Sequence, residues 1–471
     1  MSIDLLFKRR FSRVAIAPLP STTEHPKANE ASGEENPGAG HSVWDKLPVE
    51  VRLRILGFVG SGGRDLAALA TAARVSRDWN SLANSGDVLV CVEMNRSFSA
   101  DKVMILGALV TRSKGFLRQL DLRGLLPPSS IASHKTQIDS AVIRSIVHNC
   151  PNIQYLNLAR CNFLSTSQVL ALLRDLPHLT HVNLCGLRAV CDMTLDILSR
   201  PGRLVSLDVS YCPRVTDKGI SFIVDRCQDM ACFLLSGVNA ATDLILSNMS
   251  RLAHLEALDI SESDNITDIG LQHTFLSLKT HHTSLVPPLT HTDQDFHLPP
   301  PSLKLTPTLH KLISLNLSNS PAAITDTLLT ILAWSTPNLH DIVLRNSAHI
   351  TDMGVSRLAE GCTLLEHVDV GGCARVGLAS FEALGLCCGR TLRVLRAPFC
   401  PRVTDECLRA LLSLCTRLRV LSVDDCPRVS DAFLEALAAD PVPSLEVVEV
   451  RDCARVTMRA VRDALARVNR P

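Results

Sequence analysis

The chain has 471 residues, with 48 basic and 47 acidic side chains, so its formal net charge is only +1. This balance argues against a global field that would recruit nucleic acid or an anionic membrane. No apolar run reaches the roughly 18 residues that span a bilayer, and no signal-peptide pattern opens the chain. We therefore expect a protein of the cytoplasm and/or the nucleus that binds neither nucleic acid nor membrane.

The first segment, residues 1–41, is rich in Pro, Ser, Glu, Gly and Asn and has no hydrophobic periodicity. Such a composition indicates a disordered tail. The tail contains a basic cluster made of Lys8, Arg9, Arg10 and Arg13. A solvated cluster is the simplest interpretation, and a weak localisation signal is the alternative.

Residues 42–90 predict a compact helical unit. It opens with Leu47-Pro48, and a proline suits the first turn of a helix, where its missing N–H costs nothing. A unit of about fifty residues buries too little surface to be stable on its own. The segment also carries more apolar side chains than such a unit can hide, so a partner protein is the natural way to cover them.

The motifs of this unit, L-P-x-E-V at 47–51, D-L-x-x-L at 65–69 and V-S-R-x-W at 75–79, together resemble the F-box. In that family the partner is a Skp-type adaptor, which connects to a cullin-RING ubiquitin ligase. The resemblance implies adaptor contacts through Leu47, Pro48, Val51, Ile55, Leu56, Val75 and Trp79. The alternative is an ordinary helical cap on the domain that follows.

After a helical linker expected at 91–115, residues 116–471 repeat about twelve times the pattern L-x-x-L-x-L-x-x-C-x-x-V-T-D, clearest at 204–217. The leucines predict a short strand, the residues beyond Thr-Asp predict a helix, and that pair is a plausible N-cap. One unit cannot bury its own apolar face, whereas stacked units can, and they curve as they stack. We predict an α/β fold in which a three-helix F-box precedes a right-handed α/β solenoid, a horseshoe with a parallel sheet on its concave face.

The repeats resemble the cysteine-containing leucine-rich repeats of F-box proteins, including the fungal antagonist-of-mitotic-exit-network family. Their cysteines recur at fixed positions, as in Cys400, Cys426 and Cys453, which favours buried structural thiols over disulfides. No C-x-x-C pair is present, so we predict no metal site and no cofactor.

A proline-rich insertion at 280–308 interrupts the period and predicts a mobile loop. It also holds His281, His282, His291 and His297. These side chains are most simply solvated, because their spacing matches no preformed metal site.

Two features of the later repeats are candidates for binding a target. The strand register predicts that valines and polar residues face the concave side, namely Val394, Arg396, Val420, Ser422, Val447 and Glu449. Exposed aliphatic side chains in a row suggest a contact patch. The alternative is that flanking repeats simply cover the valines.

The second feature is an arginine ladder, in which Arg214, Arg375, Arg402, Arg428 and Arg455 hold one repeat position. Stacked guanidinium groups such as those of Arg402 and Arg428 bind phosphate or carboxylate well. The alternative is internal neutralisation, because Asp405 and Asp431 lie three residues beyond two members of the ladder.

No motif for catalysis is recognisable, neither a P-loop nor G-x-S-x-G nor H-E-x-x-H. The resemblance implies a non-enzymatic specificity subunit of an SCF-type (Skp-cullin-F-box) ubiquitin ligase that holds a protein substrate on the concave face. A non-catalytic scaffold or stoichiometric regulator without ubiquitin transfer is the alternative. No obligate homo-oligomer is expected.

Overall fold

The computed structural model describes residues 47–49, 52–53, 56, 74–75, 79, 82, 90–93, 102–113, 115–123, 140–276, 309–320, 324–440 and 442–462. They form two compact units. The smaller unit holds the described residues up to 157 together with 175–179, and the larger holds 158–174 and 180–462. The predicted tail at 1–41 and the insertion at 280–308 lie outside the described residues.

The smaller unit alternates strands with helices. Its elements are β1 (Cys91–Glu93), α5 (Lys102–Ser113), β2 (Gln119–Asp121), α6 (Ser140–Asn149) and β3 (Tyr155–Asn157). The strands pair in parallel in the order β1-β2-β3. Residues 91–93 were expected in a helical linker, and this is wrong, because they form a strand that pairs with β2. Of the linker, only α5 is helical in the described residues.

The larger unit continues this alternation with ten parallel strands in sequence order, from β4 to β13. The strands are β4 (His181–Asn183), β5 (Ser206–Asp208), β6 (Cys232–Leu234), β7 (Ala257–Asp259), β8 (Ser314–Asn316), β9 (Asp341–Val343), β10 (His367–Asp369), β11 (Val394–Arg396), β12 (Val420–Ser422) and β13 (Val447–Glu449). The helices are α7 (Thr166–Arg174), α8 (Asp192–Ser199), α9 (Asp217–Arg226), α10 (Asp243–Met249), α11 (Asp268–Leu276), α12 (Asp326–Ser335), α13 (Asp352–Gly361), α14 (Leu378–Cys388), α15 (Asp405–Leu414) and α16 (Asp431–Ala439).

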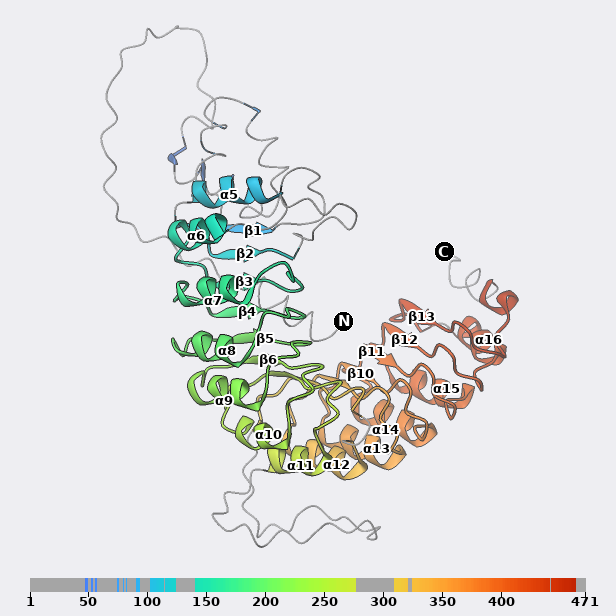
Figure 1. The fold of residues 1–471 in the computed structure, drawn as a ribbon. Helices are drawn as coiled ribbons and strands as arrows, with labels where there is room; N and C mark the ends of the chain where they lie inside the picture. Colours follow the sequence, from blue (N-terminus) through green and yellow to red (C-terminus); the bar gives the residue numbers. More distant parts are fainter. Residues whose placement is uncertain are drawn as a thin grey trace, which may run out of the picture. The chain divides into compact units, whose positions relative to one another are not determined.

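Within this unit the strands lie on the inner side of an arc and the helices on its outer side (Figure 1). The middle residue of each strand enters the core, as Leu395 and Leu421 do, and both are fully buried. The first and third residues therefore face the concave side, because side chains alternate along a strand. The repeat pattern thus predicts the α/β solenoid correctly, and it places the two columns of concave residues.

In many repeats of the larger unit, an aspartate links the repeat to the next one. Asp326 begins α12, and its carboxylate accepts hydrogen bonds from the backbone N–H of Thr351, at 2.8 Å, and from the Thr351 hydroxyl, at 2.6 Å. Thr351 is the N-cap of α13, and its side chain accepts from the N–H of Met353. Equivalent links join Asp192 to Thr216, Asp217 to Thr242, Asp243 to Thr267, Asp405 to Ser430 and Asp431 to Thr457. The predicted Thr caps are confirmed, and the aspartates have an additional role between repeats.

The cysteines of the repeat also connect neighbours. The thiol of Cys400 donates to the carbonyl of Val370 at 3.3 Å, and that of Cys426 donates to the carbonyl of Ala397 at 3.2 Å. Burial raises the pKa of both thiols to about 12. None of the 17 cysteines is in a disulfide. The interpretation of these two cysteines as buried structural thiols is confirmed.

Candidate partner-binding surfaces

The F-box-like segment is described at a few positions only. Val75 is 63% exposed and Val49 is 38% exposed, so the segment presents large apolar side chains to solvent. Pro48 is exposed as well, whereas Leu47 and Trp79 are half-buried. The backbone N–H of Arg52 donates to the carbonyl of Pro48 at 3.1 Å, as in a first helical turn.

Two other residues expected to contact an adaptor lie outside the described residues, namely Val51 and Ile55. Leu56 was also expected on that surface, but it is fully buried. Its side chain therefore belongs to the interior, and we leave it out of the docking surface. Val49 was not selected from the sequence, because the apolar pattern alone does not separate exposed from buried positions.

The concave valines lie side by side as the register predicts. Val394 pairs with Val420, and Val420 pairs with Val447, in neighbouring parallel strands. Val394 and Val420 are half-buried, and Val447 is 42% exposed. We call these three residues the valine column. The column forms an apolar strip on the concave side of the last three strands.

The residues beside the valine column are polar. Arg396 pairs with Ser422, and Ser422 pairs with Glu449. Arg396 and Glu449 are half-buried, whereas Ser422 is only 3% exposed, so the expectation that Ser422 contacts a target is not supported. Its small hydroxyl lies between two longer neighbours.

Arg396, Ser422 and Glu449 are the third residues of their strands. In most other repeats, the side chain of the third strand residue forms a turn with the backbone that follows. The carboxylate of Asp369 accepts from the N–H of Gly371 at 3.1 Å, and that of Asp208 accepts from the N–H of Ser210 at 3.0 Å. Asn316 does the same with its amide oxygen, accepting from the N–H of Ser318. These Asx turns give the position a structural role. Arg396 cannot form such a turn, because a guanidinium has no acceptor.

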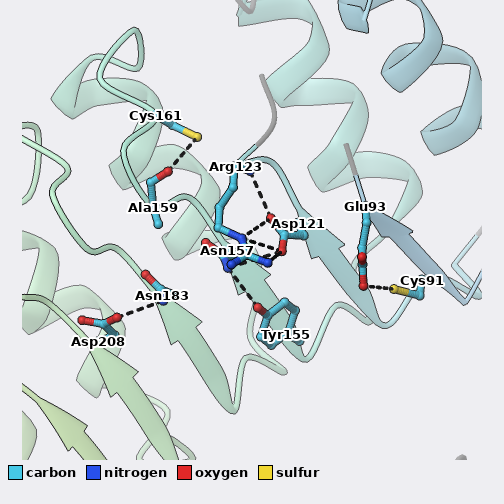
Figure 2. Close-up of polar contacts among 10 residues, drawn as sticks. All are labelled: Cys91, Glu93, Asp121, Arg123, Tyr155, Asn157, Ala159, Cys161, Asn183 and Asp208. Carbon is cyan, nitrogen blue, oxygen red and sulfur yellow. Dashed lines mark hydrogen bonds and ion pairs between the residues drawn. The ribbon is translucent and has the colours of Figure 1, made fainter. Parts of the chain in front are cut away.

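Figure 2 shows Asp121, the equivalent residue of β2 in the smaller unit, between Arg123 and Asn157. Arg123 donates to Oδ2 of Asp121 from Nε, at 2.9 Å, and from Nη2, at 2.6 Å, and its Nε also donates to Oδ1 at 3.1 Å. Asn157 donates to the Tyr155 hydroxyl at 3.0 Å. Burial raises the pKa of Tyr155. The cluster fixes the ends of β2 and β3, and these contacts were not predicted from the sequence. In the larger unit, Figure 2 shows Asn183 donating to Asp208, at 2.9 Å.

The arginine ladder is exposed at all of its five positions. The alternative interpretation, neutralisation by Asp405 and Asp431, has no ion pair to support it in the described residues. Both carboxylates accept hydrogen bonds from the next repeat, at Ser430 and Thr457. Among residues 324–440 and 442–462, no ion pair includes a ladder arginine. The ladder is therefore a row of cationic groups open to solvent.

The described part of the chain contains no group of three or more His, Cys, Asp or Glu side chains arranged to hold a metal ion. Nor does any helix in that part have the length and apolar character to cross a membrane. Its binding features are the exposed apolar residues, the concave face and the ladder.

Comparison with known proteins agrees with this architecture. The family model described as F-box-like matches residues 44–89, and the leucine-rich-repeat model matches 204–224 and 251–272. The crystal structure of the Rad7 and Elc1 complex in yeast is similar over 87% of this chain and 91% of that chain, with 18% identity and a TM-score of 0.57. An internalin (inlF) from Listeria monocytogenes str. 4b F2365 is similar over 68% of this chain and 91% of that chain, with 14% identity and a TM-score of 0.38. The chain thus combines an F-box-like segment on its N-terminal side with an α/β solenoid of leucine-rich repeats.

Proposed function

We propose that this protein is the substrate receptor of an SCF-type ubiquitin ligase. The F-box-like match at 44–89 carries the proposal, because F-box proteins bind a Skp-type adaptor, which links them to a cullin. The exposed Val49 and Val75 give that segment an apolar surface for such a partner. A structural relative, Rad7, forms a complex with Elc1, which supports a protein partner for this architecture.

The solenoid supplies target recognition in this proposal. The valine column offers an apolar strip to a target. Arg396 lies beside it and offers a cationic side chain that takes no part in an Asx turn. The ladder residues Arg402 and Arg428 are a second subsite, suited to a phosphate or carboxylate of the target. The resemblance of the repeats to the antagonist-of-mitotic-exit-network family is part of the same proposal.

The receptor contributes proximity and no chemistry of its own. A target held on the solenoid raises the local concentration of its lysines near the conjugating enzyme, which converts a bimolecular encounter into an effectively intramolecular one. Enzymatic steps then belong to the other subunits of the ligase.

Adaptor binding tests the proposal. We expect the purified chain to co-elute with a Skp-type adaptor, and Leu47→Asp with Val75→Asp to abolish co-elution. The matched control is Leu244→Asp, because Leu244 is an exposed apolar residue of the larger unit. Circular dichroism should show an unchanged fold in both variants. Undiminished co-elution of the double variant refutes this docking surface, and an absence of adaptor binding by the unaltered chain refutes the ligase proposal.

A further inference from the structure

The third residue after each strand of the larger unit lies in a turn with a left-handed backbone. At this turn position, φ is between 54° and 74° after strands β4 to β13. Gly, Asn or Asp holds the position after seven of these ten strands, because these residues tolerate a positive φ. Tyr211, Glu262 and Phe399 hold it after the other three. A bulky side chain is strained in this conformation, so each of these residues calls for a compensating contact.

Tyr211 obtains this compensation within the fold. Its hydroxyl donates to the carboxylate of Glu262 at 2.8 Å and accepts from the hydroxyl of Ser236 at 3.4 Å. Its ring covers the turn glycine of the next repeat, since a Cβ on Gly237 would lie 2.7 Å from a ring carbon. Tyr211 and Glu262 therefore account for each other at the turn position.

Phe399 cannot be held in the same way, because its side chain has no polar group. It is 62% exposed, compared with 46% for Tyr211. An exposed aromatic ring on a strained backbone does not help the chain to fold, and residues kept under such strain cluster at functional sites. Aromatic side chains also carry much of the binding energy at protein interfaces. Phe399 therefore has the properties of an anchor for a partner.

Arginines with unused donors lie on both sides of Phe399 in the chain. Arg396 is the last residue of β11, and its guanidinium forms no ion pair in the described part of the larger unit. Asp369 lies beside Arg396 in the strand register, but it pairs with Arg345 at 2.9 Å. Arg402 is exposed and donates to a carbonyl of the preceding repeat at 3.4 Å. Both guanidinium groups therefore have donors left for an acceptor from outside.

Most acids close to Phe399 in the sequence are committed to the fold. The carboxylate of Asp405 accepts from the N–H and the hydroxyl of Ser430, and that of Asp424 accepts from the N–H of Arg451 at 2.7 Å. Asp425, at the turn position after β12, is half-buried and is the exception among the described residues. This surface therefore still offers an aromatic ring and guanidinium donors, which suit an apolar residue next to carboxylates.

We propose that Phe399 anchors a target segment in which a large apolar residue is flanked by acidic residues, and that Arg396 and Arg402 bind the acids. The apolar residue stacks on the Phe399 ring, and the carboxylates accept from the two guanidinium groups. Each repeat supplies a single ladder arginine, so the cations are spread along the solenoid, which suits separate carboxylates better than one phosphate. The inference rests on the proposed function in taking the occupant to be a target.

Three fluorescein-labelled peptides test this proposal with the purified full-length chain. They are Gly-Glu-Glu-Trp-Glu-Glu-Gly, the same peptide with Ala for Trp, and the same peptide with Gln for every Glu. Fluorescence anisotropy should show that the first peptide binds about tenfold more tightly than either of the others. Equal affinities, or no measurable binding of the first peptide, overturn the proposal. The adaptor is absent from this assay, so its outcome is independent of the co-elution that tests the ligase proposal.

Phe399→Asn removes the ring and keeps the turn, because Asn319 and Asn346 hold the same position with φ of 57° and 59°. This variant should bind the acidic Trp peptide about tenfold more weakly. The matched control is Leu386→Gln, which replaces an apolar side chain of α14 that is 72% exposed. The control should leave the affinity unchanged, and equal losses in the two variants overturn the proposal.

The arginines have a separate readout. Arg396→Gln with Arg402→Gln should abolish the preference for the acidic over the neutral Trp peptide, because the donors for the carboxylates are lost. The matched control is Arg357→Gln with Arg409→Gln, which removes the same charge from exposed sites on α13 and α15. A preference that survives in the first variant, or that is lost equally in the control, overturns the proposal.

Thermal unfolding separates a role in binding from a role in the fold. Phe399→Asn should leave the melting temperature unchanged or raise it, because Asn tolerates the left-handed backbone better than Phe does. Tyr211→Asn, at the same turn position, should lower the melting temperature, because its hydrogen bond to Glu262 is lost. If Phe399→Asn also lowers the melting temperature, the ring serves the fold and the proposal is overturned.

Discussion

Replacing Asp326 by alanine removes the link between two neighbouring repeats in the larger unit. The two carboxylate oxygens accept from the N–H and the hydroxyl of Thr351, at 2.8 and 2.6 Å. Thr351 in turn caps α13. One side chain therefore holds the N-terminus of the next helix, and its loss should loosen the interface between these repeats.

The expected magnitude follows from the two hydrogen bonds. A hydrogen bond to a charged group contributes about 1.5–3 kcal/mol, and the lower end applies because Asp326 and Thr351 are both half-buried. An acid in the first turn of a helix adds about 0.3–1 kcal/mol. We expect Asp326→Ala to lower the free energy of unfolding by about 3 kcal/mol. Because each repeat contacts only its neighbours, the transition should also broaden into two steps.

Urea unfolding followed by circular dichroism measures both effects. The matched control is Asp225→Ala, which removes an exposed ion pair with Arg251. Such pairs contribute about 0–1 kcal/mol, so the control should lose no more than that. If Asp326→Ala and Asp225→Ala lower the free energy of unfolding equally, the role of the aspartate link is refuted.

Three further changes test other parts of the structure. Val420→Asp puts a charge in the middle of the valine column and should reduce target recovery at least tenfold in affinity capture, with adaptor binding intact; unchanged recovery would place the target elsewhere. Arg402→Glu should abolish any capture of the target that is sensitive to phosphatase. Arg214→Glu, at the same position of an earlier repeat, should leave that capture intact. Capture of the target that is unaffected by phosphatase would exclude the ladder as a phosphate-binding site. The raised pKa of the Cys426 thiol means that the unfolded chain releases this proton first, so stability should fall as pH rises from about 9 towards 12. The melting temperature should therefore drop between pH 8 and pH 10, and Cys426→Ala should reduce that drop; an equal drop would show that the thiol is not responsible.

The repeat architecture could be predicted because its signal is redundant. Each copy carries the same spacing of leucines, so a single weak copy does not obscure the period, and the register of Val394, Val420 and Val447 follows directly. The first strand was missed because residues 91–93 lack the leucine pattern that marks the other strands. It becomes a strand by pairing with β2, which is a tertiary effect.

Burial at individual positions was less predictable. Leu56 and Ser422 were both expected on binding surfaces, and both are buried. Periodicity gives the direction in which a side chain points but not the size of the neighbours that cover it. The link from Asp326 to Thr351 was also missed, because it joins residues 25 positions apart and the Thr-Asp pair was interpreted only as a cap of its own helix.

The most direct test of the receptor proposal is the fate of a captured target. A chain with Leu47→Asp and Val75→Asp should recover the target from cells but fail to promote its ubiquitination with purified adaptor, cullin and conjugating enzyme. The Val420→Asp chain should bind the adaptor and also fail, because it no longer holds the target. Ubiquitin transfer that persists at full rate in either variant would contradict the separation of the two surfaces.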